Sequence, residues 1–252
     1  AIPFQIAIDP AGRFAYVGTN GNLLAYAIDG ATGALSALAG SPFAVGTLHL
    51  AVTFHPTGEF VYVTNQASGS VSSYRVNAAT GDLSDVAGSP FATGGGNPSS
   101  IAIDPTGRFA YVTNSSTGSV AAFAIEAATG ALTPVAGSPF AAGGCLQSAT
   151  VDPTGRFVYV ANTGCGGTGS VLAYTLDAAT GALTPVSGSP FAAGIGAYSV
   201  TVEPTARFAY VTNITVGTVS AYSIHAVTGA LTPLAGSPFA AVVGSCAMSL
   251  VK

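Results

Sequence analysis

Hydrophobic and polar positions follow a short pattern that is clearest between residues 101 and 140. Residues 101–104 form an apolar run, residues 108–114 alternate in polarity, and residues 119–125 form a further mainly apolar run. Short runs of these kinds predict β-strands. Between the first two, Asp104, Pro105 and Gly107 occupy turn positions that these residue types favour. Residues 132–140 form a fourth extended segment, whose prolines restrict it to the edge of a sheet.

The whole chain repeats this pattern. A turn proline recurs at intervals of 46 to 51 residues, at Pro10, Pro56, Pro105, Pro153 and Pro204. A Ser-Pro-Phe sequence recurs in step, ending at Phe43, Phe91, Phe140, Phe191 and Phe239. Four short strands in each repeat, with no helical periodicity, predict the blades of a β-propeller. We therefore expect one all-β domain over residues 1–252, with blades at about 5–47, 48–96, 97–145, 146–196 and 197–245.

The two ends of the chain leave the closure of the propeller open. Residues 5–9 and 247–251 both resemble the first strand of a blade, and a five-bladed ring needs only one of them. We expect a closed ring of five blades with a spare strand at 246–252. That strand would pair with an exposed sheet edge of another copy of the chain. The alternative is a five-blade portion of a larger, seven-bladed ring.

The repeats carry motifs of a known family. Tyr-Val-Thr-Asn occurs at 62–65, 111–114 and 210–213, together with IAIDPTGRF, ATGALTPV and GSPF sequences. These motifs resemble the YVTN-repeat β-propellers and the lactonase-like propellers related to 6-phosphogluconolactonase. The resemblance covers nearly the whole chain and implies a propeller fold. The lactonase-like relatives have seven blades, and the resemblance implies acidic, basic and histidine groups at the mouth of their channel.

Composition restricts the class of partner. Only 6% of residues are charged and the net charge is −4, so the chain has no basic surface for nucleic acid. No apolar run approaches the ~18 residues of a membrane span. We expect an extracellular or cell-surface protein, because low charge and abundant Thr, Ser and Gly suit that setting.

Most charged residues belong to the repeat itself. An acidic residue before the turn proline is followed four residues later by arginine, except in blade two, where both residues change together. The coupled change predicts a side-chain pair across each turn: Asp9 with Arg13, His55 with Glu59, Asp104 with Arg108, Asp152 with Arg156, and Glu203 with Arg207. A second polar set is expected to bond the amides of the next turn: Asp29, Asn77, Glu126, Asp177 and His225. Four charged residues remain without a role: Arg75, Asp82, Asp85 and Lys252.

Loops that enter the first strands and loops that join the second and third strands are expected to share one face. Residues that the repeat does not explain gather there, and the candidate ligand or partner residues are His49, Asn97, Gln147, Tyr198 and Met248. This set contains no carboxylate or arginine to activate water or hold an oxyanion. We therefore predict no catalytic residue, no metal and no cofactor.

Two of the three cysteines fall on that same face. Cys145 enters blade four, and Cys165 lies in a lengthened loop of the same blade, so a disulfide and two free thiols are both open. A disulfide would indicate an oxidising compartment. Cys246 is left over. Asn114 and Asn213 match the glycosylation sequon, but they also belong to the repeat motif.

The sequence thus favours a non-enzymatic scaffold, binding or self-assembly module whose partner is protein, chiefly a second copy of itself. A glycan or small sugar is a further possible ligand. The alternative is a lactonase-like hydrolase that acts on a sugar lactone at the loop face.

Overall fold

A computed structural model describes residues 3–46 and 51–244 as five consecutive sheets. Blade one contains β1 (Pro3–Ile8), β2 (Phe14–Thr19), β3 (Asn22–Ile28), β4 (Leu35–Ala37) and β5 (Phe43–Ala44). Blade two contains β6 (Val52–Phe54), β7 (Phe60–Asn65), β8 (Ser70–Val76), β9 (Leu83–Asp85) and β10 (Phe91–Ala92). Blade three contains β11 (Pro98–Ile103), β12 (Phe109–Asn114), β13 (Ser119–Ile125), β14 (Leu132–Pro134) and β15 (Phe140–Ala141). Blade four contains β16 (Leu146–Val151), β17 (Phe157–Asn162), β18 (Ser170–Leu176), β19 (Leu183–Pro185) and β20 (Phe191–Ala192). Blade five contains β21 (Ala197–Val202), β22 (Phe208–Asn213), β23 (Thr218–Ile224), β24 (Leu231–Pro233) and β25 (Phe239–Ala240).

Each blade is a four-stranded antiparallel sheet with an interrupted outer strand. In blade three the order is β11-β12-β13-β14, and β15 pairs with the other end of β13. Because β14 and β15 both pair with β13, the two short strands together form the outer edge, and a cis Ser138–Pro139 bond lies between them. This arrangement confirms the prediction of five blades of four strands. In the part of the chain described there is no helix, and hence none that could cross a membrane.

The turn motif that opens each blade sets the strand register. In blade three the Asp104 carboxylate accepts the backbone N–H of Phe109 at 2.6 Å, and the backbone N–H of Gly107 donates to the Asp104 carbonyl at 2.9 Å. Gly107 has φ +76°, which a side chain would strain. These contacts bring Ile103 opposite Ala110, the first pair of the β11–β12 ladder.

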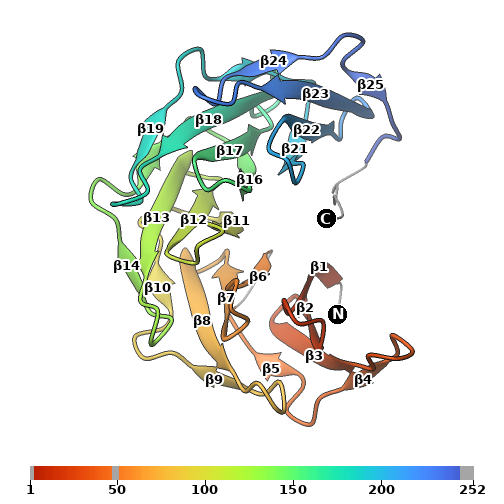
Figure 1. Cartoon of the computed structure of the whole chain (residues 1–252), viewed down its shortest axis with the longest axis vertical. Coiled ribbons are helices and arrows are strands. Elements are labelled where there is room, and N and C mark those ends of the chain that lie inside the picture. The colour runs from red at the N-terminus through yellow and green to blue at the C-terminus, as the bar shows by residue number, and fades with distance from the viewer. Residues whose placement is uncertain (1–2, 47–50, 245–252) are drawn as a thin grey trace.

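Figure 1 shows the five blades side by side in an arc, with β1, β6, β11, β16 and β21 toward its centre. Blades one and five form the two ends of the arc and do not meet. In blade one Ile6 and Ile8 are 53% and 56% exposed, whereas Ile101 in blade three is 6% exposed. The expectation of a closed five-bladed ring is therefore wrong, and the alternative of five blades from a larger ring is correct. The predicted spare strand at 246–252 lies outside the described residues.

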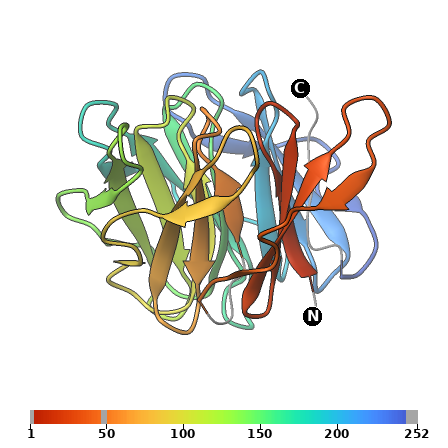
Figure 2. The ribbon, with the colours of Figure 1, turned by 90° about the horizontal axis from the view of Figure 1, so that it is seen from below.

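The hydrophobic core lies between neighbouring blades. Four clusters of buried side chains each combine two adjacent blades; one of them joins Phe109 and Tyr111 of blade three to Tyr174 and Leu183 of blade four. Such a blade buries its apolar surface only when the next blade covers it. Figure 2 shows the strands running between two opposite faces of the arc, where the loops lie.

Candidate active site at the loop face

One of the two faces of the arc carries the loops that vary most between blades. Pro98, the first residue of β11, is opposite Asn114, the last residue of β12, so the loop entering β11 and the loop leaving β12 lie on the same face. Backbone hydrogen bonds link these loops: Cys145 N–H, at the entry to blade four, donates to the Ser115 carbonyl of blade three at 3.2 Å, and within blade four Thr163 N–H donates to the Cys145 carbonyl at 3.2 Å. We call it the loop face.

The inner strands carry a bulge at the loop face. The register of the inner pair shifts around Phe4 in β1, Ser99 in β11, Gln147 in β16 and Tyr198 in β21. A bulge re-aims the side chain at that position and is common beside active sites. All four residues lie on inner strands, which Figure 1 shows toward the centre of the arc. We call these four residues the bulge set.

The bulge set combines an apolar ring with hydrogen-bonding groups. Phe4 is 47% exposed, and Gln147 and Tyr198 are partly exposed. Ser99 binds back into the sheet, with its hydroxyl 2.8 Å from the Thr113 hydroxyl and donating to the Leu146 carbonyl at 3.0 Å. Sequence reasoning found Gln147 and Tyr198 but missed Phe4 and Ser99. All four occupy one position of the repeat, the second residue of the inner strand.

Asn97 and Cys145 share a second repeat position, immediately before the inner strand. Both have positive φ, of 54° and 57°, a conformation that Asn tolerates better than most residues. Asn97 is exposed, and its carbonyl accepts the N–H and the hydroxyl of Ser115 at 3.0 and 2.9 Å. Cys145 is bonded to Cys165, with the Cα atoms 5.3 Å apart. This disulfide fastens the long β17–β18 loop to the loop entering β16, and it settles the choice between a disulfide and two free thiols.

The remaining candidates divide into those that lie beyond the described structure and those that lie in the core. His49, Met248 and Cys246 lie outside the described residues. Asn114 and Asn213 are 0% and 1% exposed, and each donates from its side-chain amide within the blade, at 3.2 Å to Ser119 and at 2.9 Å to Ser220. Neither sequon is therefore accessible for glycosylation in the folded protein.

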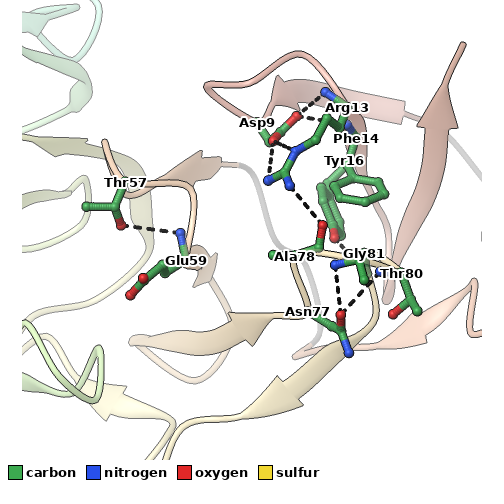
Figure 3. A network of polar contacts seen from close by, with 11 residues as sticks. Asp9, Arg13, Phe14, Tyr16, Thr57, Glu59, Asn77, Ala78, Thr80 and Gly81 are labelled. Carbon is green, nitrogen blue, oxygen red and sulfur yellow. Dashed lines mark hydrogen bonds and ion pairs between the residues drawn. The ribbon is translucent and has the colours of Figure 1, made fainter. Parts of the chain in front are cut away.

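The turn residues lie on the face of the arc opposite the loop face; Figure 3 shows those of blades one and two. In blade one the Asp9 carboxylate forms an ion pair with Arg13 at 3.0 Å. Within the described ranges this is the only Lys/Arg–carboxylate ion pair. Asp9 also accepts the backbone N–H of Phe14 at 2.8 Å.

In blades three to five the carboxylate accepts backbone N–H groups without the ion pair, as Asp152 does from Arg156 and Phe157, both at 2.7 Å. The predicted side-chain pair thus forms in blade one, whereas in blades three to five the acid binds the turn. In blade two, among the described residues, the His55 side chain bonds Thr57 and Gly107 and not the Glu59 side chain.

The arginines connect neighbouring blades. Arg108 lies over the ring of Phe109 at 5.1 Å and donates to the Ala178 carbonyl of blade four at 3.0 Å. In blade two, where the repeat position holds Glu59, Arg75 takes this role from the adjacent strand. Its guanidinium lies over Phe60 at 4.7 Å and donates to the Ala128 carbonyl of blade three. This contact gives Arg75 the role that the sequence had not revealed.

Acidic residues on this face accept hydrogen bonds within the turns. Hydrogen bonds from Thr32 and Ala31 lower the pKa of Asp29, and bonds from Thr180 and Ala179 lower that of Asp177. Burial alone would raise the pKa of Glu203, but hydrogen bonds led by those from Thr205 hold that pKa at about 2.

His55 binds the Gly107 carbonyl of blade three through Nε2 at 2.8 Å. Its Nδ1 lies 2.8 Å from the Thr57 hydroxyl. Among the described residues, no three His, Cys, Asp or Glu side chains are grouped to hold a metal ion.

Fold and loop face together define a β-propeller with its variable groups around the central axis. The family of lactonases with a seven-bladed β-propeller matches the chain over residues 3–92, 52–147 and 146–241. The chain belongs to this family. A comparison with curated protein sequences finds no match.

Solved structures show the same fold at low sequence identity. A putative 6-phosphogluconolactonase from Bacteroides uniformis has a TM-score of 0.83 and 17% identity, over 97% of this chain and 72% of that one. A putative 6-phosphogluconolactonase from Bacteroides fragilis has a TM-score of 0.83 and 19% identity, over 97% and 71%. The periplasmic gluconolactonase of Pseudomonas aeruginosa has a TM-score of 0.76 and 20% identity, over 97% and 74%.

These matches correct the functional expectation. A non-enzymatic scaffold or self-assembly module was favoured because the loop face is poor in charged groups. The family is one of lactonases, so the alternative expectation of a lactonase-like hydrolase is the better supported one.

Proposed function

We propose that this protein hydrolyses a sugar lactone at the loop face. The observation that carries the proposal is the family match, which extends over residues 3–241 in three overlapping segments. In the reaction, water adds to the lactone carbonyl, the ring C–O bond breaks, and the ring oxygen leaves as a hydroxyl. One hydroxy acid forms, and at neutral pH one proton is released for each ring that opens.

The bulge set supports this location. Gln147 can donate from its amide to a sugar hydroxyl or to the lactone carbonyl, and Tyr198 can donate from its phenol. Phe4 adds apolar surface beside them. Donors aimed at a carbonyl stabilise the oxyanion that forms when water adds. His49, which the sequence predicts in the loop entering blade two, lies outside the described residues; the ordinary pKa of a histidine suits a general base near neutral pH.

The arginines favour an uncharged lactone over a phosphorylated one. All five arginines lie over phenylalanine rings at the turn end of the blades, 4.7–5.3 Å from the ring centroids. Four of them also donate to a carbonyl of the next blade. These guanidinium groups therefore form their contacts on the face of the arc opposite the loop face. Glucono-δ-lactone is the substrate that this distribution favours over its 6-phosphate.

Proton release measures the reaction directly. The purified chain should accelerate acid production from glucono-δ-lactone above the spontaneous rate, and should do so less well with the 6-phosphate. His49→Ala should lower kcat by about a hundredfold, the scale of general-base catalysis. Tyr198→Phe should lower kcat/KM by about tenfold, the equivalent of one hydrogen bond.

The control is His225→Ala. His225 is exposed at the opposite end of the blades, where its ring accepts the backbone N–H of Thr228 at 3.2 Å. This variant should retain full activity. If no lactone is turned over faster than in buffer, the proposal is wrong. Turnover that survives both His49→Ala and Tyr198→Phe would place the site elsewhere.

We also propose that the protein works outside the reducing cytosol. The Cys145–Cys165 disulfide supports this, because such bonds persist in oxidising compartments. The likeness to a periplasmic gluconolactonase agrees with it. Fractionation of the source cells would test the proposal: recovery with the cytosolic fraction in reduced form would contradict it.

A further inference from the structure

Three residues share a left-handed backbone conformation at the entry to an inner strand. Asn97, Cys145 and Gly196 come directly before β11, β16 and β21, and their φ angles are 54°, 57° and 77°. Each carbonyl accepts the backbone N–H of the residue that follows the second strand, at 3.0 Å in blade three, 3.2 Å in blade four and 2.9 Å in blade five. The entry to the inner strand therefore has one conformation in these three blades.

Residue type accounts for this conformation in two of the three blades. Glycine adopts positive φ freely, and asparagine tolerates it better than most residues. Cysteine has no such tolerance, because in the left-handed region its Cβ comes too close to a backbone carbonyl oxygen. A restraint other than residue type therefore holds Cys145 in this conformation.

The disulfide to Cys165 supplies that restraint. Cys165 lies in the β17–β18 loop, in a turn where the Gly167 N–H donates to the Gly164 carbonyl at 2.9 Å. The two central residues of this turn, Cys165 and Gly166, have φ angles of 50° and 93°, as in a type I′ turn. Cys145 and Cys165 are two of the four non-glycine residues with positive φ that the structure describes. The crosslink thus joins two backbone positions that are each unfavourable for cysteine.

The start of β16, where Gln147 lies, depends on the conformation of Cys145. Upstream, the Cys145 N–H donates to the Ser115 carbonyl of blade three at 3.2 Å. Downstream, Leu146 is 0% exposed and pairs with the last residue of β17, and the register then shifts around Gln147. The Gln147 carbonyl accepts the Thr113 hydroxyl of blade three at 3.3 Å. A relaxed φ at Cys145 therefore disrupts one of these contacts, and all of them lie within two residues of Gln147.

We propose that Cys145 is a positioning residue for the loop-face site. Bonded to Cys165, it keeps the start of β16 in the left-handed conformation and so holds Gln147 beside the inner strand of blade five. The two inner strands are joined there, because the Val200 N–H donates to the Ser148 hydroxyl at 2.8 Å. This inference rests on the proposed function, since it assigns the disulfide to the same site.

The arrangement makes the site sensitive to a dithiol. The two sulfurs of the dithiol form a disulfide with each other, and the Cys145 and Cys165 sulfurs leave as thiols that carry the two protons of the dithiol. Cys165 is exposed and Cys145 partly exposed, so the bond is open to such a reagent. Without the bond, the left-handed conformation of Cys145 is disfavoured by about tenfold. Lactone turnover should fall by a similar factor, because only molecules with the left-handed entry are competent.

Two variants without the disulfide separate positioning from crosslinking alone. Both carry Cys165→Gly, since glycine suits a turn position with positive φ. One adds Cys145→Asn, the residue that blade three has at this position, and the other adds Cys145→Ala. Both lose the crosslink and should unfold at a lower temperature than the parent. The Asn variant should keep kcat/KM within about twofold of the parent and should not respond to a dithiol, whereas the Ala variant should lose about tenfold.

Hydrogen exchange followed by NMR gives a readout that does not depend on turnover. The backbone amides of residues 145 and 149 donate to the Ser115 carbonyl and the Ser100 hydroxyl, both at 3.2 Å. They should exchange faster in the reduced parent and in the Ala variant, but not in the Asn variant. Ala206→Gly is the control, because Ala206 has φ 57° in a turn on the face opposite the loop face. It should change neither the activity nor the response to a dithiol.

The outcomes separate this inference from the proposed function. If the parent turns over no lactone, the proposed function fails and the positioning of a lactone site fails with it. If the parent is active, equal kcat/KM in the Asn and Ala variants would overturn the role of Cys145 and leave the proposed function standing. Full activity of the reduced parent, or equal exchange at residues 145 and 149 in the two variants, would have the same consequence.

Discussion

The hydroxyl of Tyr159 gives the sharpest test of how the blades adhere. It donates to the Gly229 carbonyl at 2.9 Å, and Tyr159 is 0% exposed. Tyr159→Phe removes the donor and leaves a buried carbonyl without that partner. A buried hydrogen bond contributes about 1 kcal/mol net, and an unsatisfied acceptor costs about 1–3 kcal/mol. We therefore expect the substitution to lower the free energy of unfolding by about 1–2 kcal/mol.

Tyr210→Phe is the matched control. Tyr210 has the same repeat position in blade five, but no following blade is described against it, and it is partly exposed. Its substitution should change the free energy of unfolding by less than about 0.5 kcal/mol. The chain has no tryptophan, so urea unfolding is best followed by circular dichroism. Repeat proteins can lose two-state behaviour, and equal m-values across the variants would justify the comparison. Equal losses for Tyr159→Phe and Tyr210→Phe would refute the reasoning.

Three further predictions address other contacts. Arg75→Ala should destabilise the protein by about 1 kcal/mol, and Glu59→Arg in that background should restore the loss by placing arginine where the other blades have it; urea unfolding measures both, and the absence of rescue would contradict the assigned role. The Glu203 pKa of about 2 lies below its ordinary 4.5, so its stabilising contribution is complete above pH 4.5 and disappears as the pH falls toward 2; melting curves of Glu203→Gln should lack this part of the pH dependence, and an unchanged profile would count against the turn hydrogen bonds. Reduction of the disulfide between Cys145 and Cys165 should cost about 3 kcal/mol, because it closes a loop with a sequence separation of 20 residues; alkylation should label one of the three cysteines before reduction and all three after it, and three labels before reduction would exclude the bond in solution.

Local structure followed closely from the sequence. The third strand of the template repeat was expected at 119–125, and the structure has it at Ser119–Ile125. The outer segment 132–140 became β14 and β15 on either side of a cis proline. These elements are predictable because an Asp-Pro-x-Gly turn separates the first and second strands and an A-x-T-G turn separates the third and fourth, and turn chemistry acts within a few residues.

Contacts between blades were harder to foresee. Arg75 had no role in the sequence because its partners, Phe60 and Ala128, lie on another strand and another blade. Closure of the ring was predicted wrongly for a related reason. Each blade carries the same motif in a ring of five or of seven, so a local residue pattern does not give the number of blades in the ring.

The candidate site residues stay a prediction, to which the structure adds two neighbouring positions. Gln147 and Tyr198 differ visibly from the repeat, but Phe4 and Ser99 look like ordinary strand residues until the bulge register places them at the same position. The candidate loop-face residues include no carboxylate or arginine, and for this reason the sequence favoured a non-enzymatic protein. A lactone is a reactive ester, so a small set of donors and one base could suffice for its hydrolysis, and composition alone could not decide the matter.

Lactone turnover is the measurement that tests the central claim most directly. The purified chain, with its disulfide intact, would be assayed for acid release from glucono-δ-lactone against a buffer blank and against His49→Ala. The proposed function predicts a rate above the blank that falls by about a hundredfold in the variant. A rate equal to the blank, in protein shown by circular dichroism to be folded, would contradict it.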